Sequence, residues 1–327
     1  MRAWVVDRIT ETGTMDLREA PFPPYLVDGC VLAVEAAGVN FLDTLMMRGL
    51  YQVKPPLPFT PGIEVVGIVA RKGPDSSYEI GQRICALLEH GGYAEMAAAA
   101  RLASLPVPAH IPPRDAVALP AVYPTAFLAL RDRARLQPGE TVLVHAGAGG
   151  VGSASIQLAK HWDAFVIATA GGPEKTALCR ELGADVAIDY REPGLVERVR
   201  EATRGRGVDV AVDPVGGELT QATLRCLAWG GRLVIVGFAG GSIPAIPANR
   251  LLLKNAAALG VYWGAYRQHH PDLVEATFLE IFRLYDQGVV RPLVRDVFPL
   301  EHAPQALAAI AGRGTVGKVA LLMEARP

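Results

Sequence analysis

Cysteine is scarce in this sequence of 327 residues. The chain has four, they lie dozens of residues apart, and none belongs to a CxxC pair: Cys30, Cys85, Cys179 and Cys226. This spacing favours buried free thiols in a reducing compartment over disulfide bonds or a cysteine-rich metal site. We therefore expect a cytoplasmic protein.

Long apolar runs and an excess of either charge are also missing. No apolar run reaches the roughly 18 residues of a membrane-spanning helix. The first ten residues carry three charges and no long apolar segment, so we expect no secretory signal there. With 33 acidic and 32 basic residues the formal net charge is -1. Nucleic-acid binding through a basic face is therefore not expected.

What is present is a chain long enough for two domains. Short segments rich in valine and isoleucine occupy the first part, at 30–39, 62–70 and 83–88, and clusters of glycine and proline separate them. This spacing predicts a β-rich domain, a sandwich or barrel. A helical pattern follows from Arg114 to Leu136.

From residue 141 onward, strands alternate with helices. This alternation indicates βαβ units and a doubly wound parallel sheet covered on both faces. We expect strands at 141–146, 165–170, 186–190, 208–213 and 232–238, and helices at 153–162, 174–183, 197–205 and 218–230.

The alternation stops near Gly264. A helix at 272–288, a strand near 293–298, a helix at 303–312 and a strand at 318–323 make a tail too short to fold alone. We expect this tail to pack on the first domain. The predicted division is 1–120 with 267–327, and 121–266, with ligands in the cleft between the two.

A glycine-rich loop follows the first strand of the α/β part. Residues 147–152 match G-x-G-x-x-G between an apolar strand and a helix, which is the context that the motif requires. Gly147 permits the tight turn, Gly149 lets the backbone approach a pyrophosphate, and Gly152 lets the helix pack closely. Gly150 and Val151 start the helix, where free amides face the phosphates. The alternative is an ordinary turn without a ligand.

The second strand of this part ends without the carboxylate that binds the ribose 2′-hydroxyl of NAD. Thr169, Ala170 and Gly171 leave room there for a 2′-phosphate, and Lys175, Tyr190 and Arg191 lie near enough in the sequence to contact it. One charged hydrogen bond of about 1.5–3 kcal/mol would favour NADPH over NADH by roughly tenfold to a hundredfold. The alternative for Lys175 is a solvated helix residue.

Seven segments together resemble the zinc-free quinone oxidoreductase branch, the zeta-crystallin-like group, of the medium-chain dehydrogenase/reductase superfamily. The resemblance covers nearly the whole chain and implies a Rossmann domain plus a GroES-like β-rich catalytic domain. The segments are GVNFLDTLMMRGLY (38–51), PFTPGIEVVGIV (58–69), GQRICALLEHGGYAE (81–95), LPAVYPTAFLAL (119–130), VLVHAGAGGVGSASIQLAK (142–160), ELGADVAIDY (181–190) and GKVALL (317–322).

The zinc-bearing members of that superfamily have ligands at positions where this chain has Asn40 and Ile63, and a further ligand near Tyr123. Glu64 stands alone, and we expect His269-His270 in a surface loop before Pro271, so the sequence predicts no metal. Without a Lewis acid, the resemblance implies hydride transfer to an acceptor that spreads negative charge itself, such as a quinone or an enone.

The resemblance also implies site residues. Asn40 faces the nicotinamide or the substrate, and Tyr51 lies at the mouth of the same cleft. Asp43 either handles a proton or caps the helix that begins there. Thr125 lies near the nicotinamide.

Further cofactor contacts come from the same resemblance. Gly237, Phe238 and Ala239 end the fifth strand of the α/β part, where such folds hold the nicotinamide ribose. Asn249 and Lys318 match positions that contact the cofactor in relatives, and Lys254 is a weaker candidate. Pro124 departs from the relatives' pattern and stiffens its turn.

The sequence thus favours an NADPH-dependent quinone reductase. The alternatives are reduction of a carbon–carbon double bond in an enone, an acrylate-like acid or an enoyl thioester, and a non-enzymatic nucleotide-binding or RNA-binding protein. An apolar strand within 255–263 at the edge of the parallel sheet is a pairing surface. We therefore expect a homodimer.

Overall fold

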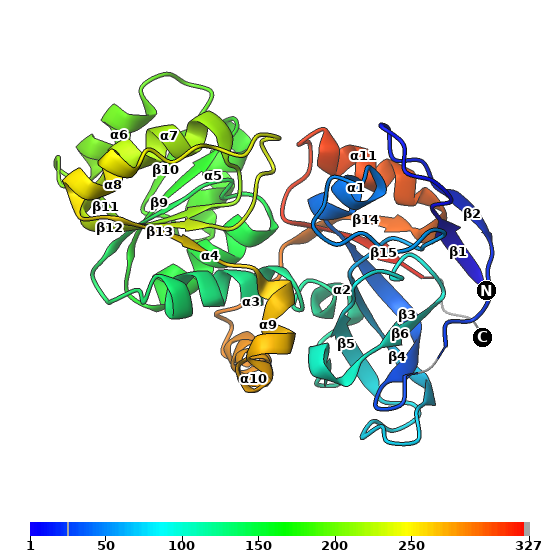
Figure 1. Cartoon of the computed structure of the whole chain (residues 1–327). Coiled ribbons are helices and arrows are strands. Elements are labelled where there is room, and N and C mark those ends of the chain that lie inside the picture. Colours follow the sequence, from blue (N-terminus) through cyan, green and yellow to red (C-terminus); the bar gives the residue numbers. More distant parts are fainter. Residues whose placement is uncertain (25, 324–327) are drawn as a thin grey trace. The chain divides into compact units, whose positions relative to one another are not determined.

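The computed structural model describes residues 1–24 and 26–323. The chain forms two compact units, which are drawn in Figure 1. The first comprises Met1–Ala121, Gly264–Phe282 and Pro292–Pro327, and the second comprises Val122–Trp263 and Arg283–Arg291. Arg283–Arg291 thus groups with the second unit, whereas the sequence-based division puts it with the first.

The first unit is built on a seven-stranded sheet. Its order is β14-β15-β3-β4-β5-β7, with β6 also paired to β3. The strands are β3 (Cys30–Val39), β4 (Glu64–Lys72), β5 (Arg83–Leu87), β6 (Met96–Ala99), β7 (Ser104–Pro106), β14 (Val294–Pro299) and β15 (Lys318–Leu322). A separate antiparallel pair joins β1 (Arg2–Val5) to β2 (Asp16–Glu19).

The C-terminal segment adds two strands to this sheet, whereas the sequence predicts only that the tail packs on the first domain. β15 pairs antiparallel with β3, with Ala320 opposite Gly38, and β14 pairs with β15. α11 (Ala303–Ala311) buries Ala303, Ala306 and Leu307 in the same core cluster as Leu32 and Val65. The other helices are α1 (Phe41–Met47) and α2 (Pro113–Ala116), together with most of α9 (Trp263–His269) and of α10 (Pro271–Asp286). There are also 3₁₀ turns at Arg101–Ala103 and Leu300–His302.

The second unit has a six-stranded, wholly parallel sheet of order β10-β9-β8-β11-β12-β13. The strands are β8 (Thr141–Val144), β9 (Phe165–Ala170), β10 (Val186–Asp189), β11 (Val208–Asp213), β12 (Leu227–Ile235) and β13 (Ala257–Gly260). Numbered within the unit this is 3-2-1-4-5-6, the dinucleotide-binding order, and its switch point lies between β8 and β11. The predicted α/β fold is confirmed.

Helices cover both faces of the parallel sheet. Figure 1 shows α4 on one face and α6 and α7 on the other. The helices are α3 (Val122–Phe127), a π-helical segment (Leu128–Arg133), α4 (Gly150–His161), α5 (Pro173–Glu181), α6 (Leu195–Ala202), α7 (Gly217–Cys226) and α8 (Ala248–Lys254). No helix in the described part of the chain is long and apolar enough to cross a membrane.

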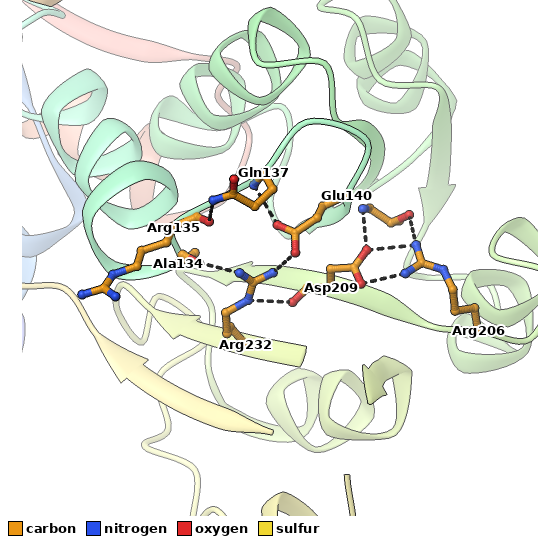
Figure 2. A network of polar contacts seen from close by, with 8 residues as sticks. Ala134, Arg135, Gln137, Glu140, Arg206, Asp209 and Arg232 are labelled. Carbon is orange, nitrogen blue, oxygen red and sulfur yellow. Dashed lines mark hydrogen bonds and ion pairs between the residues drawn. The ribbon is translucent and has the colours of Figure 1, made fainter. Parts of the chain in front are cut away.

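A polar network ties the segment before β8 to the start of β11 and to Arg232 within β12 (Figure 2). Arg232 of β12 donates to the carbonyls of Ala134 (2.7 Å) and Asp209 and pairs with Glu140. Arg206 makes two hydrogen bonds to the Asp209 carboxylate, at 2.7 and 2.9 Å. This network lies at the edge opposite to the carboxyl ends, so it supports the register of the strands without reaching a ligand there.

One predicted helix is shorter than its pattern. The expected helix at 218–230 ends at Cys226, and Leu227 begins β12 by pairing with Val208. Lys254 donates from Nζ to the carbonyls of Arg225 (2.9 Å) and Leu227, which closes the helix end. A residue far along the chain therefore sets this boundary.

Candidate functional site

Asn40 stands where the central strand of the first unit turns into a helix. β3 ends at Val39 and α1 begins at Phe41, so Asn40 is the N-cap, with φ -123° and ψ 152°. Its backbone N–H donates to Oδ2 of Asp43 at 2.8 Å. Asp43 thus has the capping role that the sequence allows. The same oxygen accepts a hydrogen bond of 2.7 Å from the Tyr93 hydroxyl.

The carboxamide of Asn40 is held from both ends. Its Nδ2 donates to Oε1 of Glu64 at 2.8 Å, and its Oδ1 accepts from Nζ of Lys318 at 2.6 Å. Lys318 and Glu64 also form an ion pair. Asp43, Glu64, Tyr93 and Lys318 are buried, whereas Asn40 is only partly buried. We call these five residues the Asn40 cluster.

Burial dominates the electrostatics of the Asn40 cluster. It raises the pKa of Asp43 to about 6, against hydrogen bonds from Tyr93 and from the backbone of Asn40 that lower it. Burial lowers the pKa of Lys318 to about 7, which the nearby Asp43 carboxylate partly offsets, and it raises the pKa of Tyr93 well above its usual value. A low-dielectric site disfavours the charged form of each group.

Sequence reasoning missed Glu64 and Tyr93 as members of this cluster. Two glycines make room for them. A Cβ atom at Gly38 would clash with the Glu64 carboxyl group, and one at Gly62, whose φ is +95°, would lie 2.5 Å from the Tyr93 ring. The available signal was a lone glutamate beginning an otherwise apolar strand, because an unpaired buried charge is costly.

The structure places Tyr51 and Thr125 in different units. Tyr51 lies in the loop after α1, partly buried against the core of the first unit. A hollow of about 210 Å³ opens beside that loop, lined by Ile9, Met46, Gly49, Lys54, Pro55 and Leu57. Thr125 lies in α3 of the second unit and is partly buried.

The glycine loop connects β8 to α4 at the switch point. Gly147 N donates to the carbonyl of Thr169 at 2.8 Å, and a Cβ at Gly147 would lie 2.8 Å from Sγ of Cys179. A Cβ at Gly152 would clash with the carbonyl of Ala146, whereas one at Gly149 would meet only that carbonyl, at 3.2 Å. Two glycines therefore permit close packing, and Gly149 faces open space at the start of α4, before Gly150 and Val151.

The ends of β9 and β10 bring together several predicted phosphate contacts. Gly171 lies against the Tyr190 side chain, because a Cβ atom at Gly171 would be 3.0 Å from the Tyr190 hydroxyl oxygen. A Cβ atom at Gly172 would clash with the Arg191 guanidinium. Lys175 is partly exposed in the first turn of α5. Ala170 pairs with Asp189 across the two strands.

Asp189 organises this turn and was missed in the sequence. Its carboxylate accepts from the backbone N–H groups of Gly172 (2.9 Å) and Arg191 (3.0 Å), and its Oδ2 pairs with Nη2 of Arg191 at 3.0 Å. The Arg191 side chain, mainly by hydrogen bonding, holds the pKa of Asp189 well below its usual range. No sequence spacing identified it, because its role depends on the turn that β9 and α5 form.

Thr169 joins the glycine loop to a buried histidine. His145 Nδ1 lies 2.9 Å from Oγ1 of Thr169, and Nε2 lies 2.7 Å from Oγ1 of Thr223. Thr223 donates its hydroxyl proton to the carbonyl of Leu219. It therefore accepts from Nε2–H, and Nδ1 accepts from Thr169. Burial lowers the pKa of His145 to about 4 and keeps the ring neutral.

The remaining predicted contacts follow β12. Gly237, Phe238 and Ala239 lie just beyond its end, where Ala239 N donates to the carbonyl of Pro214 at 3.0 Å. Asn249 is exposed on α8. Lys254 closes the end of α7, and Lys318 belongs to the Asn40 cluster of the first unit.

The sequence predicts that the paired histidines, His269 and His270, lie at the surface and bind no metal. Both are exposed as predicted, but the predicted loop is wrong, because His269 ends α9 and His270 is the single residue before α10. Among residues 1–24 and 26–323, no three His, Cys, Asp or Glu side chains are grouped so as to hold a metal ion. All four cysteines are free and buried, which confirms that prediction.

A doubly wound sheet with a glycine loop at its switch point, joined to a β-rich unit, defines a dinucleotide-dependent dehydrogenase or reductase. Two family models match the chain. The alcohol dehydrogenase GroES-like domain matches residues 28–109, and the zinc-binding dehydrogenase model matches residues 150–278.

Similar proteins narrow the class. The rat quinone oxidoreductase-like protein 2 is 41% identical over 293 residues, which cover 89% of this chain and 84% of the rat protein. The mouse quinone oxidoreductase is 34% identical over 302 residues, 90% of this chain and 88% of that protein. The chain belongs to the zinc-free quinone oxidoreductase branch of the medium-chain dehydrogenase/reductase superfamily, as the sequence predicts.

Solved structures agree with this assignment. The quinone oxidoreductase from Thermus thermophilus, whose complex with NADPH is also known, is 38% identical with a TM-score of 0.86, and the match covers 98% of this chain and 100% of that one. The Escherichia coli quinone oxidoreductase complexed with NADPH is 28% identical with a TM-score of 0.90 over 98% and 100% of the two chains.

Proposed function

We propose that this protein is an NADPH-dependent reductase that transfers hydride to a quinone. The observation that carries the proposal is the position of Arg191. Asp189 holds its guanidinium against Gly172, at the end of the strand where a NAD-preferring site has a carboxylate. The similar Thermus and E. coli enzymes that form NADPH complexes support the same coenzyme.

The residues of the second unit fit a dinucleotide. The amides that begin α4, at Gly150, Val151 and Gly152, have no acceptor within the helix and suit a pyrophosphate, and Gly149 leaves space for it. Tyr190, Arg191 and Lys175 suit the 2′-phosphate beside Thr169, Ala170 and Gly171. Contacts by Gly237, Phe238, Ala239, Thr125 and Asn249 stay predictions. Lys318 is 4% exposed and its Nζ is bound to Asn40 and Glu64, so we propose that it acts through Asn40 and not on the coenzyme. We assign 121–266 as the coenzyme domain and 1–120 with 267–327 as the catalytic domain, except that Arg283–Arg291 groups with the coenzyme domain.

When bound, the coenzyme supplies hydride, and this chain supplies the groups around the acceptor. Asn40 is the partly exposed member of its cluster, so its amide is positioned to donate to an acceptor oxygen. That donor stabilises negative charge as it develops on the oxygen. The oxygen then takes a proton, so that hydride and proton together give the hydroquinone. Tyr51 is partly buried in the same unit as Asn40. The Asp43 carboxylate holds Asn40 in place by accepting a hydrogen bond from the Asn40 backbone N–H.

The second candidate is reduction of the carbon–carbon double bond of an enone, acrylate-like acid or enoyl thioester. An amide donor at Asn40 favours an enolate oxygen on the same physical ground as a quinone oxygen. Turnover with a small quinone and with an enone at equal NADPH separates the two. We expect the larger kcat/KM with the quinone, and the reverse order would favour the second candidate.

Coenzyme binding is tested by fluorescence titration with NADPH and NADH. We expect wild type to bind NADPH about tenfold to a hundredfold more tightly, in line with one charged hydrogen bond. Lys175→Ala and Arg191→Ala should each reduce this ratio while leaving NADH affinity unchanged. Arg225→Ala, at the exposed C-terminal end of α7, is the charge-matched control. Equal affinity of wild type for both coenzymes, or an unchanged ratio in both variants, would contradict the assignment.

A homodimer is part of the proposal. β13 is an edge strand of the parallel sheet, and the preceding helix exposes Leu252 (78%) and Leu253 (73%). An open edge beside exposed apolar side chains favours pairing with a second copy. Sedimentation equilibrium should give twice the chain mass, and a monomer mass would contradict it. Four buried free thiols support a cytoplasmic location.

A further inference from the structure

The carboxamide of Asn40 has only one orientation that satisfies its neighbours. An ammonium group has donors and no acceptor, and a carboxylate has acceptors and no donor. Lys318 therefore requires Oδ1, and Glu64 requires Nδ2, as the contacts of 2.6 and 2.8 Å show. Turning the amide over would place Nδ2 against the lysine and Oδ1 against the carboxylate, so both contacts would become repulsive.

The fixed orientation leaves one group for a ligand. Nδ2 carries two protons, of which Glu64 accepts one, and within the described part of the chain the second has no acceptor. Glu64 and Lys318 are almost completely buried, at 0% and 4% exposed, whereas Asn40 is partly exposed. A ligand therefore reaches the amide and not the two charges behind it.

We propose that Lys318 and Glu64 are positioning residues that make Asn40 an obligatory hydrogen-bond donor to the acceptor oxygen. This inference rests on the proposed function and adds a specificity rule to it. A site that offers only a donor favours an oxygen that gains negative charge, as a quinone or enone oxygen does on reduction. It disfavours an alcohol, whose hydroxyl must lose a proton to a base.

The first test is a double-mutant cycle on kcat. Lys318→Met combined with Glu64→Gln removes both charges of the ion pair together, so that neither partner is left without the other. In the wild-type background we expect kcat with a quinone to fall about tenfold, because the donor acts mainly in the transition state. In the Asn40→Ala background the same two substitutions should change kcat less than twofold, since Lys318 and Glu64 act through Asn40. An equal loss in both backgrounds, or none in either, would overturn the proposal.

A second test needs neither coenzyme nor turnover. 4-Nitrophenolate presents an anionic phenolate oxygen, whose charge is shared with the nitro group, and reports binding through its absorbance. The double variant should bind it at least fivefold more weakly than wild type, and Asn40→Ala should lose as much. Unchanged affinity in the double variant would overturn the proposal even if the wild-type enzyme does not reduce quinones.

Two controls separate positioning from misfolding and from failure of the proposed function. The preference for NADPH over NADH depends on the 2′-phosphate contacts proposed in the second unit, so the ratio of the two affinities should change less than twofold in the double variant. Circular dichroism should show the wild-type secondary structure. If wild type itself fails to oxidise NADPH with any quinone, the proposed function fails, and the phenolate experiment still decides the role of Lys318 and Glu64.

Discussion

Gly38 and Glu64 face each other across strands β3 and β4, and the Glu64 carboxyl group occupies the space that a side chain at residue 38 would need. This pairing explains how a charged side chain enters the core of the first unit. The neighbouring strand has no Cβ at that point, so the carboxylate can turn toward Asn40 and Lys318 and bind them.

Gly38→Ala should displace the Glu64 carboxylate. We expect a loss of about 1–3 kcal/mol in the free energy of unfolding, typical of an overpacked core, together with reduced quinone turnover. Gly314→Ala is the control in the same unit, because its Cβ would meet no atom closer than 3.9 Å. Denaturant unfolding and steady-state kinetics measure both effects. Wild-type stability and turnover in Gly38→Ala would contradict the role given to this glycine.

Gly149 and Gly152 should respond differently to alanine. A Cβ at Gly152 would clash with the backbone carbonyl of Ala146, so Gly152→Ala should lower the melting temperature by several degrees. A Cβ at Gly149 would lie 3.2 Å from one carbonyl and otherwise in open space. The free energy of unfolding of Gly149→Ala should therefore lie within about 1 kcal/mol of the wild-type value. The variant should nevertheless bind NADPH at least tenfold more weakly. Equal NADPH affinity in Gly149→Ala and wild type would show that no ligand occupies that space.

His145 should make the protein less stable in acid. Its pKa is about 4 in the folded protein, below the ordinary value of 6.5, so between these values the unfolded chain binds more protons. Stability therefore falls as pH drops from 6.5 toward 4, by up to about 1.4 kcal/mol per pH unit. The pKa of Asp43, about 6, lies above its ordinary value, so the contribution of Asp43 to stability is lost as pH rises through 6.

Comparison with His145→Gln isolates this contribution, because Asp43 is common to both proteins. Urea unfolding between pH 4.5 and 7 should show the difference in unfolding free energy between wild type and variant shrinking as pH falls. Parallel stability curves would indicate that His145 is not held neutral by burial.

Arg232 should contribute more to stability than Arg206. Arg232 is 21% exposed and holds Glu140 together with two carbonyl groups (Figure 2). Arg232→Met should lower the free energy of unfolding by about 2–3 kcal/mol, since it leaves the partly buried Glu140 carboxylate without its cation. Arg206 is 54% exposed, so solvent screens its pair with Asp209 and Arg206→Met should cost under about 1 kcal/mol. Urea unfolding measures the loss of stability in each variant. A larger loss in Arg206→Met than in Arg232→Met would contradict the prediction.

Much of the second unit could be predicted because its signals are local. The strands at 165–170 and 208–213 have the predicted bounds, and the glycine loop lies before α4 as expected. The helix at 218–230 was predicted too long, because its end depends on pairing between Leu227 and Val208 and on Lys254. Asp189 escaped prediction for the same reason, since the groups that it holds come from two strands and a helix start.

The sequence by itself determined the fold class, the coenzyme loop and the free cysteines, because periodicity and glycine spacing act over a few residues. It also pointed to Asn40 through resemblance. Only the tertiary structure decided what holds Asn40. Glu64 lies 24 residues away and Lys318 lies 278 residues away, and strand pairing alone brings them to one carboxamide. Burial then makes the contact between their charges strong, and burial exists only once the sheet is complete.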